Sequence, residues 1–323
     1  MQLKRVLVLG GTGFVGRHFC EQAQPLQCRL TVATRRLENA KVIQSLPWVD
    51  PVQADIHDEA TLTRLVHGHD AVVNLVAILH GTQAAFTHVH VDLVHKLVRA
   101  CRAAGVQRLV HVSALGAGLD APSMYQRSKA QGEAVLRSSG LSVTILRPSV
   151  MFGAGDHFLN LFAKLQAVFP VLPLAGAATR FQPVWVQDVA QALVNALAAG
   201  ASTGNALAQL PAPVIEACGP GIFTLKELVQ LAGRLSGHAR PVFGLPQPLA
   251  RLQAWLMEIA PGAPLMSRDN LDSMRVDNVA SGALPGLDSL GVAPSALGAI
   301  APAYLRPRAT DVLLAQRRAA GRF

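Results

Sequence analysis

Short apolar runs alternate with longer amphipathic stretches through the first half of the chain. Apolar runs of about four to eight residues that end in turn residues are typical of strands buried in a parallel sheet, whereas apolar residues spaced three and four apart are typical of helices. The pattern predicts strands over Val6–Leu9, Leu30–Thr34, Val52–Asp55, Ala71–Val76, Leu109–Val112 and Val143–Leu146. It predicts helices over Arg17–Gln24, Ala60–Val66, Phe86–Ala104 and Tyr125–Ser138.

This alternation stops after Pro148. Because strands and helices alternate before that point, we expect an α/β fold with a doubly wound parallel Rossmann sheet over residues 1–150, and a small C-terminal α/β lobe over residues 151–323 whose chain partly returns to the sheet. Two stretches read as loops, Ala201–Pro220 and Ala280–Pro302. Helices are predicted over Leu159–Val168, Val186–Ala198, Thr224–Ser236 and Pro248–Ile259.

The first predicted strand runs directly into a glycine-rich turn, Gly10-Gly11-Thr12-Gly13-Phe14-Val15-Gly16. Glycine has no Cβ, so the backbone can turn sharply and approach a pyrophosphate, while the following helix offers free N–H donors. Such a turn can also merely join a strand to a helix. Its place between strand and helix favours a dinucleotide site made by Gly10, Thr12, Gly13, Phe14, Val15 and Gly16.

Charged and polar residues follow the next strands. Arg35 and Arg36 stand where an acidic side chain would bind the ribose 2′-hydroxyl of NAD(H). Because a guanidinium binds a 2′-phosphate instead, the sequence favours NADP(H), with NAD(H) as the alternative. The two arginines could otherwise lie unbound in solvent. Residues expected along the rest of the cofactor are Asp55 and Ile56 at the adenine, then Asn74, Val76 and Ala77 toward the nicotinamide.

Tyr125 and Lys129 lie four residues apart, on one face of a predicted helix. A lysine ammonium near a phenol lowers the phenol pKa and makes it a usable general acid or base. The Y-x-x-x-K spacing is common, and it gains weight here from the strand before it, which ends in Val112 and Ser113.

Together these motifs resemble the extended short-chain dehydrogenase/reductases, and most closely an atypical branch related to the NAD(P)H-binding accessory subunit of respiratory complex I. The likeness continues through residues 146–153 and 180–189. It implies that Pro148 borders the cofactor and that Lys129 holds the nicotinamide ribose. It also implies a serine or threonine beside the catalytic tyrosine, but Ala114 stands at that position, with Ser113 one residue earlier.

Two functions follow. In one, the chain binds a nucleotide as a structural element linked to NADH:ubiquinone oxidoreductase or quinone metabolism, with little or no turnover, as Ala114 indicates. In the other, it is an NADPH-dependent reductase or epimerase that acts on a carbonyl or sugar-nucleotide substrate through Tyr125 and Lys129, with Ser113 as their partner.

Charge and composition narrow the partners. The chain is 50% hydrophobic and carries a formal net charge of +9, which favours an acidic partner such as a nucleotide, an anionic lipid surface or an acidic protein. Aromatic residues are only 5% and the arginines are scattered, so no nucleic-acid partner is expected. The four cysteines and eleven histidines show no metal-ligand spacing, so no metal site is expected. We expect a cytoplasmic protein, with a peripheral position at the inner face of the membrane as the alternative.

The predicted helix Pro248–Ile259 places Leu249, Leu252, Leu256 and Ile259 at helical spacing, with Trp255 beside them. Such a stripe usually packs into a core. The alternative is a docking face for a membrane surface or for a respiratory-chain or quinone-related protein.

Overall fold

A seven-stranded sheet forms the centre of the protein, and all of its strands run parallel. The structure is a computed structural model that describes residues 3–199, 213–259 and 264–306. The strand order, β11-β6-β5-β4-β1-β2-β3, reverses direction at β1 as in a Rossmann fold, so the predicted α/β class is confirmed. The strands are β1 (Arg5–Leu9), β2 (Arg29–Thr34), β3 (Val49–Gln53), β4 (Ala71–Asn74), β5 (Arg108–Val112), β6 (Ser142–Pro148) and β11 (Val214–Ala217).

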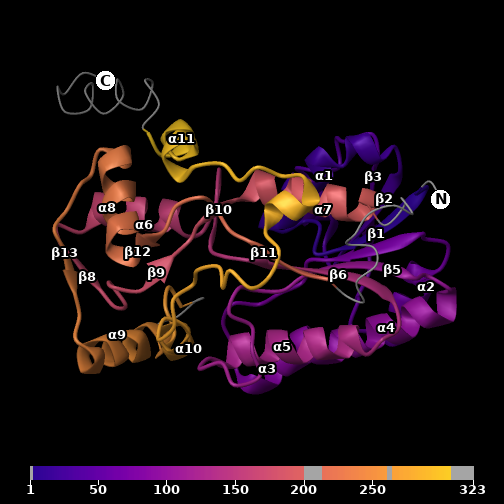
Figure 1. Cartoon of the computed structure of the whole chain (residues 1–323), viewed down its shortest axis with the longest axis horizontal. Coiled ribbons are helices and arrows are strands. Elements are labelled where there is room, and N and C mark those ends of the chain that lie inside the picture. Colours follow the sequence, from indigo (N-terminus) through magenta and orange to yellow (C-terminus); the bar gives the residue numbers. More distant parts are fainter. Residues whose placement is uncertain (1–2, 200–212, 260–263, 307–323) are drawn as a thin grey trace.

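Helices cover both faces of this sheet, which explains why its strands are apolar on both sides (Figure 1). In β1, Val6 and Val8 point into one core, and Leu7 and Leu9 point into the other. All four side chains are fully buried. One face is covered by α1 (Phe14–Gln22) and α7 (Val186–Ala199), and the other by α2 (Glu59–Val66), α4 (Leu93–Ala104) and α5 (Met124–Arg137).

Several predicted boundaries are corrected. Helix α1 begins at Phe14, not at Arg17, because the glycine turn itself forms the first helical turn, with Arg17 N bonded to Gly13 O at 3.0 Å. Strand β3 covers Val49–Gln53, so Asp55 lies beyond its end. Pro51 is tolerated there because β3 is the edge strand, where a missing N–H disrupts only one side of a ladder. Strand β4 ends at Asn74, two residues before the predicted end at Val76.

The predicted helix over Phe86–Ala104 is interrupted. It consists of α3 (Gln83–Thr87), a π-helical turn over His88–Asp92, and α4. A π turn widens the helix by one residue and changes which side chains face inward. As a result His90 faces inward and is only 3% exposed.

The stretch read as the loop Ala201–Pro220 contains strand β11, which completes the sheet beside β6. Glu216 interrupts the apolar pattern of this strand and hides it from sequence reading. The carboxylate of Glu216 is buried and accepts from Ser281 N at 2.7 Å. Residues 200–212 of the same stretch lie outside the described residues.

The remaining elements pack around a third apolar core beyond the carboxyl ends of the strands. Its helices are α6 (Leu159–Val168), α8 (Leu225–Ser236), α11 (Leu297–Ile300) and α12 (Pro302–Leu305), and the same part of the molecule contains α9 (Gln247–Ile259) and α10 (Arg268–Ser273). Its strands form three short pairs, too short to be read from periodicity: β7 (Met151–Phe152) with β10 (Val184–Trp185), β9 (Arg180–Phe181) with β12 (Phe223–Thr224), and β8 (Leu172–Leu174) with β13 (Val242–Gly244).

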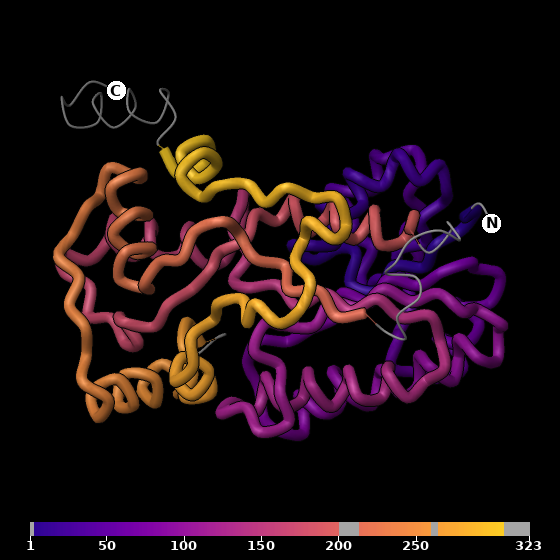
Figure 2. Tube along the Cα trace, in the orientation of Figure 1, coloured from indigo at the N-terminus to yellow at the C-terminus, as the bar shows by residue number. Residues whose placement is uncertain are grey.

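The chain after α10 joins both parts of the molecule (Figure 2). Asn278 bridges Phe181, and Ser295 N donates to the Asp188 carboxylate of α7 at 2.7 Å. The chain then returns to the third core, where the Tyr304 hydroxyl donates to Asp156 at 3.0 Å. The loop predicted over Ala280–Pro302 therefore holds the two parts of the fold together and includes α11.

Candidate functional site

The glycine turn lies at the carboxyl end of β1, in the middle of the sheet. Gly10 has φ +79°, in the left-handed region, and a Cβ there would lie 3.0 Å from the carbonyl carbon of Leu75. A Cβ on Gly16 would lie 2.4 Å from the Gly10 carbonyl oxygen. Glycine is therefore required at both positions for α1 to approach the strand this closely.

Helix α1 lacks a side-chain cap, because Gly13 occupies its N-cap position. By contrast, Asp58, Ser123 and Thr224 cap α2, α5 and α8. Gly13 is exposed, and a Cβ on it would meet only the Gly10 oxygen, at 3.3 Å. The N-terminal end of α1 thus presents uncapped N–H groups to open space, the arrangement that binds a pyrophosphate. The residues present fit a dinucleotide at this end of the sheet.

Arg35 and Arg36 follow β2 and are both exposed. Side chains hold the backbone of this pair, because Gln53 Nε2 donates to Arg35 O and Thr34 Oγ1 donates to Arg36 O. Among residues 3–199, 213–259 and 264–306, neither guanidinium has a hydrogen bond or ion pair. Both are therefore free to bind a phosphate. Nearby, Asp55 is exposed and Ile56 is buried.

Asn74, predicted to line the cofactor, is almost fully buried at the end of β4. Its side chain accepts from Val76 N at 3.2 Å and donates to His111 Nδ1 at 3.1 Å, so Asn74 shapes the turn that carries Val76 and Ala77. Ala77 is exposed and Val76 is partly buried. Pro148 is buried at the end of β6, and its carbonyl accepts from Leu115 N at 2.9 Å.

Tyr125 and Lys129 lie on α5, but no hydrogen bond joins their side chains in the part of the chain that the structure describes. The Lys129 ammonium donates to the Val112 carbonyl at 2.9 Å and is 2% exposed. Burial lowers the pKa of Lys129 to about 8, against an opposing effect of Glu133. Burial also raises the pKa of Tyr125 to about 12. The phenol is therefore protonated at neutral pH.

His90, which reaches the site through the π turn, holds the Tyr125 ring in place. The His90 and Tyr125 ring centroids are 5.6 Å apart, edge to face. Nε2 of His90 accepts from Ile78 N at 3.2 Å, so Nδ1 carries the proton and donates to Ser128 Oγ at 2.8 Å. Burial and the nearby Lys129 lower the pKa of His90 to about 3. His90 is thus a neutral packing residue. The sequence did not predict its place beside Tyr125, because no residue pattern in this stretch marks the π turn.

Ser113 and Ala114 both lie at the carboxyl end of β5 and are buried. Ser113 is 3% exposed, and its hydroxyl has no hydrogen-bond partner among the residues that the structure describes. A buried hydroxyl without a partner is costly, so the Ser113 hydroxyl is available to a hydrogen-bond partner beyond the described residues, whereas Ala114 has no polar side-chain atom.

Two further residues join the site to the third core, and sequence reading found neither. Asp269 of α10 accepts from Met124 N at 2.6 Å and Tyr125 N at 3.1 Å, so its carboxylate completes the cap of α5. Arg17 of α1 donates to Ala154 O at 3.1 Å. An acidic residue far along the chain has no local pattern that would link it to the start of α5.

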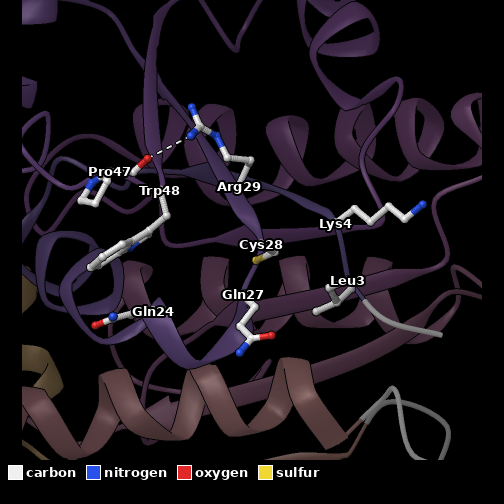
Figure 3. Close-up of a pocket in the computed structure, with 8 residues that line it drawn as sticks. All are labelled: Leu3, Lys4, Gln24, Gln27, Cys28, Arg29, Pro47 and Trp48. Carbon is white, nitrogen blue, oxygen red and sulfur yellow. Dashed lines mark hydrogen bonds between the residues drawn. The ribbon is translucent and has the colours of Figure 1, made fainter.

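A separate depression of about 460 Å³ lies at the opposite, amino edge of the sheet (Figure 3). In this depression Arg29 forms an ion pair with Asp50 and donates to Pro47 O at 2.9 Å, and burial raises the pKa of the Cys28 thiol to about 11. The glycine turn, by contrast, lies at the carboxyl edge of the sheet. The residues that line the depression are Leu3, Lys4, Gln24, Gln27, Cys28, Arg29, Pro47 and Trp48.

Within the described ranges, no cluster of His, Cys, Asp or Glu has the arrangement of a metal site. The helices within those ranges include none that is long and apolar enough to cross a bilayer.

Comparisons with known proteins agree with this geometry. Residues 10–199 match the family model for NAD(P)H-binding proteins. The chain is 31% identical to subunit 9 of the NADH dehydrogenase [ubiquinone] 1 alpha subcomplex of Rattus norvegicus, over 90% of this chain and 76% of the rat protein. It is 33% identical to the ceramide reductase of Caulobacter vibrioides, over 58% of this chain and 59% of that protein.

Solved structures share the fold. The dTDP-glucose 4,6-dehydratase DesIV of Streptomyces venezuelae, solved with NAD bound, superposes with a TM-score of 0.72 at 22% identity, covering 93% of this chain and 95% of DesIV.

Proposed function

Because the chain belongs to the NAD(P)H-binding family that includes subunit 9 of the NADH dehydrogenase alpha subcomplex, we propose that it holds NADPH as a tightly bound group beside a quinone-reducing respiratory protein, with little turnover of its own. In this proposal the protein works in the cytoplasm, at the inner face of the membrane. The uncapped start of α1 behind the glycine turn is the observation that carries the proposal.

The preference for NADPH rests on Arg35 and Arg36. Both guanidiniums are exposed on a backbone held by Thr34 and Gln53, and no acidic residue stands at the end of β2 to bind a free 2′-hydroxyl. An arginine pairs with a phosphate through two parallel, charge-assisted hydrogen bonds. The remaining contacts proposed for the cofactor come from the glycine turn, Asp55, Ile56, Asn74, Val76, Ala77, Lys129 and Pro148.

Low turnover follows from the state of Tyr125. When bound, the nicotinamide supplies hydride transfer, and a reduction also needs a proton donor with a pKa near the working pH. Burial instead raises the pKa of Tyr125 to about 12, and Lys129 donates to the Val112 carbonyl rather than to the phenol.

The test is to extract the nucleotide from freshly purified full-length protein and to identify it by mass. We expect close to one NADPH per chain. Arg35→Ala combined with Arg36→Ala should weaken NADPH binding at least about tenfold and leave NADH binding within about threefold, since a charge-assisted pair contributes about 1.5–3 kcal/mol. A chain that binds neither dinucleotide contradicts the proposal.

A second function, an active carbonyl reductase, is favoured by the unpartnered Ser113 hydroxyl at the end of β5. In that case Tyr125 would supply the proton, Ser113 would donate to the carbonyl oxygen, and Lys129 would hold the ribose. Tyr125→Phe distinguishes the two functions. An active reductase loses its turnover with NADPH binding intact, whereas a structural nucleotide-binding protein keeps both its nucleotide and its stability.

A further inference from the structure

Helix α9 has its large apolar residues on the outside. Ala250 and Ala254 face inward and are 5% and 0% exposed. Leu252, Trp255 and Ile259 are 51%, 45% and 61% exposed, the opposite of a helix that packs its large side chains into a core. The expectation that this stripe belongs to the core is therefore wrong.

Neighbouring elements extend this apolar surface. Leu245, Leu249, Leu252, Leu256 and Met257 line a groove of about 490 Å³ with Pro173 of β8. Phe243 of β13, which pairs with Pro173, is 56% exposed, and Leu265 beyond α9 is 52% exposed. We call this surface, made by Pro173, Phe243, Leu245, Leu249, Leu252, Trp255, Leu256, Met257, Ile259 and Leu265, the α9 face. Single exposed apolar residues are normal on a protein surface, but an apolar groove that joins α9 to Pro173 and Leu245, flanked by further exposed apolar residues, marks an interaction site.

The charges around the α9 face are mainly positive. Between residues 240 and 275 the exposed ionisable groups are Arg240, Arg251, Arg268 and Arg275, whereas Glu258 and Asp272 are partly buried. Glu258 is bound by Arg268 at 2.8 Å, and Asp272 lies 3.8 Å from Arg251. The third acidic residue, Asp269 of α10, is buried against the start of α5. This segment of the chain therefore carries four arginines against three acidic residues, in a protein whose total formal charge is +9.

We infer that the α9 face docks on a lipid bilayer that contains anionic headgroups. An amphipathic helix binds such a surface by burying its apolar residues among the acyl chains while cations at its edge attract the headgroups, and Trp255 has the amphipathic ring favoured at that boundary. Helix α9 lies at the opposite end of the molecule from β3, which is the edge strand of the Rossmann sheet (Figure 1).

The test is flotation of the full-length protein with vesicles of phosphatidylcholine alone or mixed with phosphatidylglycerol. We expect binding to the mixed vesicles, weakening with salt, with a blue shift of tryptophan fluorescence that Trp255→Phe removes. Leu252→Glu should weaken vesicle binding at least about tenfold, because a charge would replace a leucine that is buried among the acyl chains in the bound state. Val42→Glu is the matched control: Val42 is 60% exposed, lies outside the α9 face and receives the same charge, so it should bind as the parent does.

A partner of the α9 face other than a lipid bilayer would give a different result in this experiment. If the protein ignores both kinds of vesicle and is a dimer that Leu252→Glu splits, the α9 face is an interface between two copies and the inference is overturned. If the protein ignores vesicles and is monomeric, the face serves another protein, and the inference is again overturned. Equal loss of vesicle binding in Leu252→Glu and Val42→Glu also contradicts it, because charge alone would then explain the binding.

Discussion

Lys129 is the most unusual ionisable residue of the site, because it is an ammonium held almost out of contact with solvent. Its neighbours on α5 and β5 keep it there: the Val112 carbonyl accepts a hydrogen bond from the ammonium, and Glu133 lies one helical turn away. Glu133 is itself bound by Arg147 at 2.6 Å, so its charge is shared. Keeping Lys129 charged in the folded protein therefore lowers the free energy of unfolding, and this effect can be measured.

Folding stability should depend on Lys129 between pH 8 and 10.5. The pKa of Lys129 falls from 10.5 to about 8 on folding, so in this window the unfolded chain binds more protons and stability rises with pH. The full effect is about 3 kcal/mol. Urea unfolding of the parent and of Lys129→Met at several pH values isolates it: the stability of the parent relative to the variant should rise across the window. A constant difference would be inconsistent with a lowered pKa, and Lys41→Met serves as the exposed control.

At the scale of single elements, the turn from β1 into α1 contains glycines with different tasks. Gly16 is buried against the Gly10 carbonyl, whereas Gly13 is exposed at the open end of the helix. Close packing against the Gly10 carbonyl requires glycine at position 16. At position 13, glycine leaves room for a pyrophosphate to approach the helix from outside. Substitution by alanine should separate the two tasks.

Gly16→Ala should destabilise the fold by about 3 kcal/mol or more, because a Cβ 2.4 Å from a backbone oxygen forces α1 away from β1. Gly13→Ala should change the free energy of unfolding by less than about 1 kcal/mol, since its Cβ meets only one atom at 3.3 Å. Gly13→Ala should nevertheless weaken nucleotide binding at least about tenfold, because the methyl group stands where the pyrophosphate approaches. Thermal unfolding and nucleotide titration of both variants check this, and equal effects would contradict the proposed site.

The elements that sequence reading located are those with long, regular patterns. The apolar run of β1 and the amphipathic spacing of α5 both depend on local burial, and both were placed within a residue or two. The π turn and β11 were missed for local reasons. A single inserted residue at His88–Asp92 leaves the apolar spacing nearly unchanged, and Glu216 interrupts β11 with a buried carboxylate that accepts hydrogen bonds from the distant Ser281.

At the scale of the whole molecule, the two parts of the fold meet at α5. Asp269 belongs to α10, which packs beside α9, yet its carboxylate accepts from the first two N–H groups of the helix that carries Tyr125. No sequence pattern could pair residues this far apart, because their contact exists only once both cores have formed. The position of the site residues on α5 therefore depends on where α10 lies.

Asp269→Ala should destabilise the protein by about 1–2 kcal/mol, the usual effect of removing a helix cap. Ser123→Ala, which removes the local cap of the same helix, is the matched comparison. Only the Asp269 variant should loosen α10, detected as faster amide hydrogen exchange in α10 as well as in the first turn of α5. Identical exchange patterns in the two variants would show that Asp269 acts as an ordinary local cap.

The place of β11 in the sheet has a consequence for synthesis on the ribosome. Strand β6 is an internal strand in the finished protein, but its neighbour β11 emerges more than sixty residues later. Until then the nascent chain exposes the unpaired backbone of Ser142–Pro148, an edge open to pairing with other chains. We therefore expect fragments that end before Val214 to aggregate more readily than the full chain, because they lack the strand that covers this edge.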